Sequence, residues 1–446
     1  MDILKDKPFK VFVHYAVPSI FGMLAVSSAT VVDGFFVGNY IGSTGLAAIN
    51  LSMPIFSLLF GLALMLSIGS SVISGKLIGE GDSESASLIF SKTVVSMLVM
   101  SLSFATLLYL NIDLILSILS IPPMLAEMVE IYLSWMLLFL PFLMSGLLLD
   151  YFVKIDSRPF LAFGALLLTA VVNILLDWTL IVYFEMGIFG AAFATGISQL
   201  SMLVVLLPHF FSKKASIRFV KPFGSYGVIL KAAFNGSSEF INEVSIGITT
   251  LIFNYIMLQS FGVVGVAAYT VVSYILWVAI MVSFGISDSL QAPLSKNFGA
   301  KQTERIEQFL KYALSSVIIF GVGLISIVLT VPKLIVDIFL ESKDVETIKI
   351  ILEFLALVWP IFLINGSNMV ISAYFTALHK PLASAIIALS RSLIFPVFFI
   401  LVLPLFFDKS GLYLALVAAE FMTLLIAITL FMKNSPKKII EKGVHI

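Results

Sequence analysis

The segment from Asn173 to Gln199 reads NILLDWTLIVYFEMGIFGAAFATGISQ and is the most informative part of the chain. Both flanks of a short break at residues 185–187 are apolar enough to be membrane helices. Asn173 and Asp177 are four residues apart, so they share one face of a helix. A carboxylate in hydrocarbon is costly and normally faces a protein interior or a water-filled cavity. Asp177 is therefore a functional candidate; the alternative is a position near the interface or a packing contact.

The composition is that of a polytopic membrane protein. Hydrophobic residues make up 60% of the 446 residues, charged residues 12%, and the mean hydropathy is +1.10. A soluble domain of this length carries about twice as much charge. The formal net charge is zero, so nothing indicates nucleic acid. Cysteine is absent and the four histidines show no metal-ligand spacing, so we expect neither thiolate chemistry nor a bound cofactor.

Twelve apolar runs are long enough to cross about 30 Å of hydrocarbon. They lie near residues 11–38, 46–75, 88–110, 126–152, 159–183, 187–211, 229–258, 264–288, 309–331, 349–376, 382–407 and 411–432. Runs of this length are helical in lipid, because a helix satisfies its own backbone hydrogen bonds. The sequence therefore predicts an all-α fold, with bends at Pro18, Pro141 and Pro360 inside the first, fourth and tenth spans.

The basic residues predict the orientation of these spans. With the amino terminus placed in the cytoplasm, the cytoplasmic segments hold 21 of the 26 Lys and Arg residues. The opposite segments hold Lys333, Lys343, Lys349 and Lys409, and Arg391 falls within a span. Because cytoplasmic loops are enriched in Lys and Arg, we expect a multi-pass protein of the cell (inner) membrane with both termini in the cytoplasm.

An internal repeat divides the chain. The motif Gly42-x-x-Gly45-x-Ala47-Ala48 recurs in the second half as Gly262-x-x-Gly265-x-Ala267-Ala268, and Lys76 and Gly79 match Lys296 and Gly299 at the same offset. Six spans is an even number, so the halves run in the same direction and should be related by a pseudo-twofold axis along the membrane normal. We expect a six-helix lobe at 1–211, a basic cytoplasmic linker at 212–228, and a second six-helix lobe with a short tail at 229–446.

Several short motifs, in a fixed order along the whole chain, resemble one known family. They are Pro18, Asp33, the Gly42–Ala48 motif, Gly75 to Gly81 followed by Asp82, Asn173-x-x-x-Asp177, Gly187 to Thr195, and Gln291-x-Pro293 to Gly299-Ala300. Their order and spacing are similar to those of the multidrug and toxic compound extrusion (MATE) family. The resemblance implies a twelve-helix, two-lobed antiporter that expels organic cations and other amphiphiles in exchange for protons or sodium.

The resemblance also implies a coupling site for H+ or Na+ in the first lobe. In prokaryotic members of the family an Asp in helix one, with an Asn, an Asp and a Thr in helices five and six, carries the coupling ion; Asp33, Asn173, Asp177 and Thr195 match these positions. Independently, the helical rise puts the two aspartates and Thr195 about 8–12 Å from the outer ends of their spans. Neighbouring carboxylates can share a proton or offer oxygen ligands to Na+. No other metal is expected.

A second polar site is predicted in the other lobe. Glu239 and Glu243 share one helix face in the seventh span, and Arg391 lies at a similar depth. Glu243 resembles a second cation-binding carboxylate of some family members, although the companion Asp expected in span ten is missing. The alternative is an ion pair with Arg391, and the two are compatible if Arg391 leaves when a cation enters. Glu420 in the last span is another candidate partner for Arg391.

Three classes of function fit a chain of this kind. The first is an efflux antiporter that acts as a monomer in the lipid bilayer on small amphiphilic or cationic substrates. The second is a lipid-linked precursor flippase of related architecture, which would be expected to have a strongly cationic cavity; Arg391 is the only Lys or Arg away from the ends of a span. The third, an intramembrane enzyme, would need a nucleophile or metal cluster that the sequence lacks. We therefore expect a transporter and not an enzyme, with proton and sodium both open as coupling ions.

Overall fold

The described chain is almost entirely helical and contains no strand. The computed structural model describes residues 1–333 and 345–442, in which eleven helices are long and apolar enough to cross a bilayer. A twelfth span is the pair α13 (Val345–Val358) and α14 (Ile361–Ala377), bent by 55° at a break that contains Pro360. The predicted all-α fold with twelve spans is confirmed, and so is the predicted bend in the tenth span. Lys343 and His445, both considered above, lie outside the described residues.

Contacts divide the chain into two units. Unit one comprises Met1–Lys5 and Val17–Gly236, and unit two comprises Asp6–Ala16 and the described residues after Gly236. These units are not the predicted lobes: the start of the first span groups with unit two, and the chain between residues 212 and 236 groups with unit one. The predicted limits of 1–211, 212–228 and 229–446 stay a prediction.

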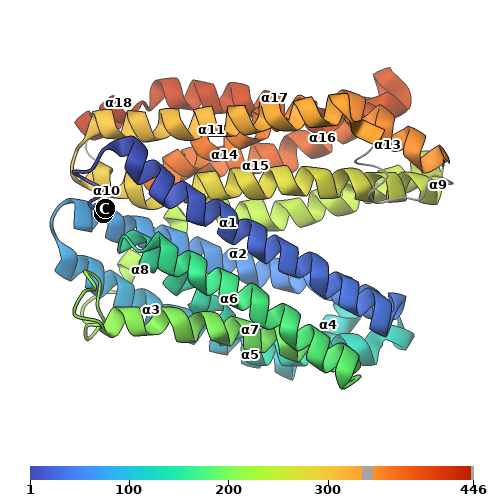
Figure 1. Cartoon of the computed structure of the whole chain (residues 1–446), viewed down its shortest axis with the longest axis horizontal. Coiled ribbons are helices and arrows are strands. Elements are labelled where there is room, and N and C mark those ends of the chain that lie inside the picture. The colour runs from blue at the N-terminus through green and yellow to red at the C-terminus, as the bar shows by residue number, and fades with distance from the viewer. Residues whose placement is uncertain (334–344, 443–446) are drawn as a thin grey trace. The chain divides into compact units, whose positions relative to one another are not determined.

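The first helix, α1, begins in unit two and continues past Pro18 into unit one, and the other helices of unit one come after it in the chain (Figure 1). The elements in order are α1 (Pro8–Phe36), the π-helical η1 (Val37–Ile41), α2 (Ser43–Gly79), α3 (Ser83–Leu110), α4 (Ile112–Ile118), α5 (Pro123–Ile155), α6 (Pro159–Asp177), the π-helical η2 (Trp178–Tyr183), α7 (Gly187–Leu206), the 3₁₀-helical η3 (Leu207–Phe211) and α8 (Gly227–Asn235).

Unit two repeats this order of spans. Its elements are α9 (Ser237–Asp288), α10 (Gln291–Gly299), α11 (Thr303–Thr330), α13, α14, α15 (Pro381–Leu389), the π-helical η4 (Ser390–Ile394), α16 (Phe395–Val402), α17 (Pro404–Lys433) and α18 (Pro436–Lys442). The long α9 contains spans seven and eight, which meet at Gly262, where the backbone leaves the helical region (φ 67°, ψ −159°).

The internal repeat is visible in the element boundaries. Helices α3 and α11 have the same length, and both of their ends are offset by the same amount as the two glycine motifs. The two glycines that open the repeated motif, Gly42 and Gly262, have φ values of 94° and 67°. Positive φ is accessible to glycine at little steric cost, so the motif marks the same turn between the first and second spans of each repeat.

The seventh span is interrupted, contrary to the prediction of one run over 229–258. Helix α8 ends at Asn235, and α9 begins after Gly236. A Cβ at Gly236 would lie 2.0 Å from the backbone oxygen of Met65, and a Cβ at Gly69 would lie 1.9 Å from that of Ala232. The two glycines therefore let the backbones of α2 and α8 approach closely. This contact holds the start of span seven on unit one.

The predicted linker is also attached to unit one. The backbone N–H of Arg218 donates to Ser87 Oγ (3.2 Å), and that of Val220 donates to Ser91 Oγ (2.9 Å). Lys92 Nζ donates to the backbone oxygen of Ser225 (2.7 Å). Because three successive parts of the linker bond to α3, its backbone polar groups have partners on this helix.

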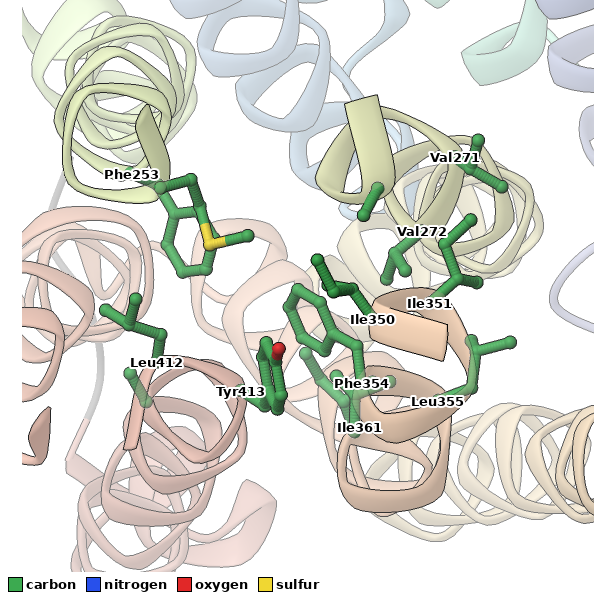
Figure 2. Close-up of a cluster of buried hydrophobic side chains, with 14 of the residues drawn as sticks. Phe253, Val271, Val272, Ile350, Ile351, Phe354, Leu355, Ile361, Leu412 and Tyr413 are labelled. Atoms are coloured by element: carbon green, nitrogen blue, oxygen red, sulfur yellow. The ribbon is translucent and has the colours of Figure 1, made fainter. Parts of the chain in front are cut away.

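The core of unit two is a cluster of buried aliphatic and aromatic side chains (Figure 2), within which several aromatic rings stack. The Phe253 and Tyr269 ring centroids are 4.2 Å apart, and those of Phe354 and Tyr413 are 4.6 Å apart. Phe354 lies 6.2 Å from both Phe253 and Tyr269, which joins the two pairs. Figure 2 shows Phe354 and Tyr413 next to each other, with Ile350 and Ile361 close by. The stack fixes the position of Tyr269, which lines the cavity described below.

The α2–α8 contact makes a first prediction. Gly69→Ala should destabilise the protein by about 1–3 kcal/mol, because the new methyl group cannot fit against the α8 backbone. Gly164→Ala is the matched control, since a Cβ there has no neighbour within 4 Å. Thermal unfolding of both purified variants in detergent measures the difference. Equal unfolding temperatures for the two variants would contradict the close packing described here.

Candidate functional site

The first candidate site lies where α1, α6 and α7 come together in unit one. Helices α6 and α7 pack side by side (Figure 1). The turn between them has positive φ at Glu185 (53°) and Gly187 (57°), which confirms the predicted break at 185–187. Asp33 lies in the last turn of α1, and Asp177 is the final residue of α6.

Both aspartates are followed closely by π-helical turns. Segment η1 begins four residues after Asp33, and η2 begins directly after Asp177. The only other π-helical segment of the described chain, η4, contains Arg391. Such turns are rare and frequently occur at functional sites. Three of the predicted charged positions therefore lie within or just before the three π-helical segments of the described chain.

The structure brings the carboxyl groups of Asp33 and Asp177 together. They are close enough to interact directly, and Tyr132 on α5 is within electrostatic range of both. Asp177 is fully buried, Asn173 is 8% exposed, and Asp33 is half-buried. Asn173 lies one helical turn before Asp177 on α6, as the four-residue spacing predicts.

Several polar atoms of this cluster have no partner among the described residues. They are Asp33 Oδ1, Asn173 Nδ2 and both carboxylate oxygens of Asp177. No described salt bridge reaches either aspartate. An uncompensated buried charge costs several kcal/mol. A proton or a small cation would offset this cost, so the geometry suits reversible loading of one or the other.

Thr195 occupies α7, which packs against α6 and η2, and its side chain is half-buried. Within the described chain its hydroxyl makes no hydrogen bond to Asp33 or Asp177. Its backbone oxygen accepts a hydrogen bond from Ser198 Oγ (2.6 Å). The four predicted residues are therefore centred on the pair Asp33 and Asp177, and a ligand role for Thr195 stays a prediction.

Small residues on α7 explain how this helix approaches the site. A Cβ at Gly190 would lie 3.3 Å from the backbone carbon of Leu180 in η2, and a Cβ at Gly196 would lie 2.0 Å from the Phe139 ring. Ala191 and Ala192 are buried in the adjoining apolar cluster with Tyr132. The predicted motif of small residues thus allows close packing of α7 against η2 and α5.

The second candidate site, in unit two, is organised around Glu420. Its Oε1 accepts a hydrogen bond from Asn365 Nδ2 (2.6 Å), and its Oε2 accepts one from Asn368 Nδ2 (2.7 Å). Arg391 Nε lies 3.5 Å from Oε1, and both charged side chains are at least nine-tenths buried. The two asparagines stand where family resemblance led us to expect an Asp, and they hold a carboxylate supplied by the twelfth span instead.

Glu239 and Glu243 lie on α9 within electrostatic range of Arg391. Both are half-buried, and neither forms an ion pair within the described chain. The π-helical turn around Arg391 is attached to the same helix: Ser392 Oγ donates to Asn242 Oδ1 (2.6 Å), and Thr249 Oγ1 donates to the Ser392 backbone oxygen (2.6 Å). Arg391 therefore has its ion-pair partner on α17 and two further carboxylates nearby on α9.

A cavity of about 340 Å³ opens beside this ion pair. Among the described residues, Arg391 and Glu420 are its only charged lining groups, and most of the remaining wall is apolar or aromatic. The aromatic lining residues are Tyr269, Trp277 and Phe362.

Sequence reasoning missed two parts of these sites. It did not place Tyr132 beside the aspartate pair, because a tyrosine in an apolar helix carries no positional signal. It also did not connect Asn365 and Asn368 with Glu420, although two asparagines three residues apart in an apolar helix indicate a buried polar partner.

Comparison with known proteins identifies the family to which the chain belongs. The family model MatE matches residues 18–179 and 239–402, which is most of the chain. The chain belongs to the MATE family of transporters. It is therefore a multi-pass membrane transporter and not an enzyme. The predicted membership is confirmed.

Individual relatives are distant but extend over the full length. The multidrug export protein MepA of Staphylococcus saprophyticus is 23% identical over 92% of this chain and 89% of its own, and that of Staphylococcus aureus is 24% identical over 93% and 92%. A solved outward-facing MATE transporter of the MOP superfamily has a TM-score of 0.92 at 20% identity, over 99% of this chain and 98% of its own. A MATE crystal structure in complex with MaL6 has a TM-score of 0.93 at 19% identity, over 99% of both chains.

The aspartate pair leads to a stability prediction. Asp33→Asn and Asp177→Asn should each raise the thermal stability of the purified MATE transporter at mildly alkaline pH, because each removes repulsion between buried carboxylates. The double variant should gain less stability than the two single variants added together, with a coupling free energy of about 0.5–3 kcal/mol.

Thermal unfolding of the two single variants and the double variant measures this coupling. Asp113→Asn, at an exposed position of α4, is the control and should be neutral. Strictly additive effects of Asp33→Asn and Asp177→Asn would show that the two carboxyl groups do not interact.

Proposed function

We propose that this MATE transporter exports amphiphilic or cationic drugs and other toxic compounds in exchange for H+ or Na+. Asp33 and Asp177 carry the coupling ion, with Asn173 and Thr195 as neutral ligands. The names of the staphylococcal relatives, which describe multidrug export, support the substrate class. The transporter acts as a monomer, by alternating access of two lobes to the two sides of the cell (inner) membrane.

One observation carries the proposal: two neighbouring carboxyl groups are buried without a cationic side chain among the described residues. Structural carboxylates in a membrane interior normally have such a partner. A site that lacks one is stable when a proton or Na+ is bound and strained when it is empty. This difference links ion binding to the conformation of the protein.

The orientation follows from the positive-inside rule. The lysines at both ends of the chain and in the linker lie in segments that this rule assigns to the cytoplasm. Asp33 and Asp177 then lie in the outer half of the membrane, where ions from outside can reach them. An inward gradient of H+ or Na+ would load the aspartates in the outward-open state, so drug release would follow loading.

The flippase alternative is not adopted. A lipid-linked precursor with phosphate groups calls for a cluster of cations. The cavity of unit two is lined by one arginine already paired with a glutamate. The cavity lining therefore carries no net positive charge, and it does not suit a diphosphate or another strongly anionic group.

Loss of either aspartate should stop coupled export. Asp33→Asn and Asp177→Asn should each reduce ion-driven efflux of a fluorescent cation to near background, because the neutral amide no longer binds and releases a proton or Na+. The measurement uses vesicles with equal amounts of protein, with Asp113→Asn as the active control. Wild-type efflux by both single variants would refute the coupling role.

Ion and drug should also oppose each other in binding. We expect drug affinity to fall when pH is lowered or Na+ is added, and the effect of Na+ to shrink at low pH, because proton and sodium exclude each other at the aspartates. Equilibrium binding of a fluorescent cation across pH, with and without Na+, tests this. Drug affinity that is indifferent to both ions in the wild type would show that the site is not coupled to export.

A further inference from the structure

Glu420 is held in place independently of Arg391. The amides of Asn365 and Asn368 each donate a short hydrogen bond to one of its carboxylate oxygens. The contact from Arg391 Nε, at 3.5 Å, is longer than a good hydrogen bond. Removing the guanidinium would therefore leave the carboxylate oriented, with its remaining lone pairs free for another cation.

Arg391 has other carboxyl groups nearby besides that of Glu420. Besides Glu420, it is within electrostatic range of Glu239 and Glu243 on α9, and within the described chain its side chain donates no hydrogen bond of good geometry. Three carboxyl groups and one guanidinium therefore share this part of unit two. An acidic environment of this kind suits a cationic ligand better than an anionic one.

The geometry points to a binding site for a protonated amine in the cavity of unit two, with Arg391 as a built-in substitute cation. In the empty cavity Arg391 compensates Glu420. When an amine enters, its ammonium group takes the place at Glu420, and Arg391 moves toward Glu243. The charge around Glu420 is thus balanced in both states, which lowers the energetic difference between the empty and the loaded cavity.

The walls of the cavity define the ligand further. Asn365 lines the cavity, and its buried Oδ1 accepts no hydrogen bond within the described chain. Glu420 and this oxygen both accept hydrogen bonds, so the ligand needs N–H donors, which a protonated amine has and a quaternary ammonium lacks. Tyr269, held by the aromatic stack, and Trp277 give the cavity aromatic walls, and aromatic side chains attract organic cations and aromatic groups. The expected ligand is a protonated aromatic amine of small size.

This inference rests on the proposed export function only in taking an amphiphilic cation as the ligand. The site is separate from the aspartate pair of unit one. This site should bind protonated and quaternary organic cations with different affinities, although both carry the same net charge.

The test uses two fluorescent probes, naphthylmethylamine and (naphthylmethyl)trimethylammonium, which share an aromatic body and a single positive charge. Their binding to the full-length protein in detergent is measured without any ion gradient. We expect the wild type to bind the protonated amine about tenfold more tightly or better, because charged hydrogen bonds contribute about 1.5–3 kcal/mol.

Substitutions at Glu420 and at Arg391 should change the affinity for the amine in opposite directions. Glu420→Gln should weaken binding of the amine about tenfold or more, whereas Arg391→Met should tighten it, because the competing internal cation is gone. The double variant should bind as weakly as Glu420→Gln, which keeps the test informative if Arg391→Met alone is unstable. Glu353→Gln is the control, since this glutamate is 53% exposed and does not line the cavity.

Two results would overturn the inference: amine binding that is unchanged in Glu420→Gln, or binding that is weakened by Arg391→Met as much as by Glu420→Gln. Failure of the inference is distinguishable from failure of the proposed function. If wild-type vesicles export naphthylmethylamine but the variants bind it as the wild type does, export stands and the cavity assignment falls. If vesicles export no amphiphilic cation, the export proposal falls, and the binding measurements still decide the cavity.

Discussion

The main physical constraint on this protein is the cost of burying negatively charged side chains inside a membrane. Asp177 buries both carboxylate oxygens next to Asp33, and no cationic side chain among the described residues compensates them. Glu420 is equally buried, but two amides and a guanidinium surround it. The aspartate pair of unit one therefore lacks a compensating side chain among the described residues, whereas Glu420 in unit two has one. Because an unpaired charge in low dielectric is so costly, this difference separates the chemistry of the two units.

The two units differ in this way although they come from one repeated plan. The boundaries of α3 and α11, the turn glycines at 42 and 262, and the order of spans all match at one common offset. The polar residues do not match: the pair at Asp33 and Asp177 has no copy in unit two, and Arg391 has none in unit one. Backbone geometry is constrained by packing at every turn, whereas a buried polar side chain needs only a partner nearby, so the fold is preserved while the sites diverge.

The repeat also relates two of the places where the chain passes from one unit to the other. The first span changes unit between Ala16 and Val17, and the seventh between Gly236 and Ser237, so the two crossings fall at equivalent positions of the repeat. Pro18 follows the first crossing, and a glycine forms the second. Each residue type weakens helical continuity, proline by removing a backbone donor and glycine by its flexibility. Both crossings therefore fall where a helix bends or breaks easily.

The sequence by itself determined the membrane class, the number of spans, the repeat and the residues of the aspartate pair. These follow from the length of apolar runs, from the 3.6-residue period of a helix and from the cost of burying charge, all of which are local properties. Only the tertiary structure decided that α8 belongs with unit one, that Asn365 and Asn368 hold Glu420, and that a cavity opens beside Arg391. Those features depend on how helices distant in sequence rotate and approach each other, and π-helical turns and glycine contacts set this geometry without a periodic signal in the sequence.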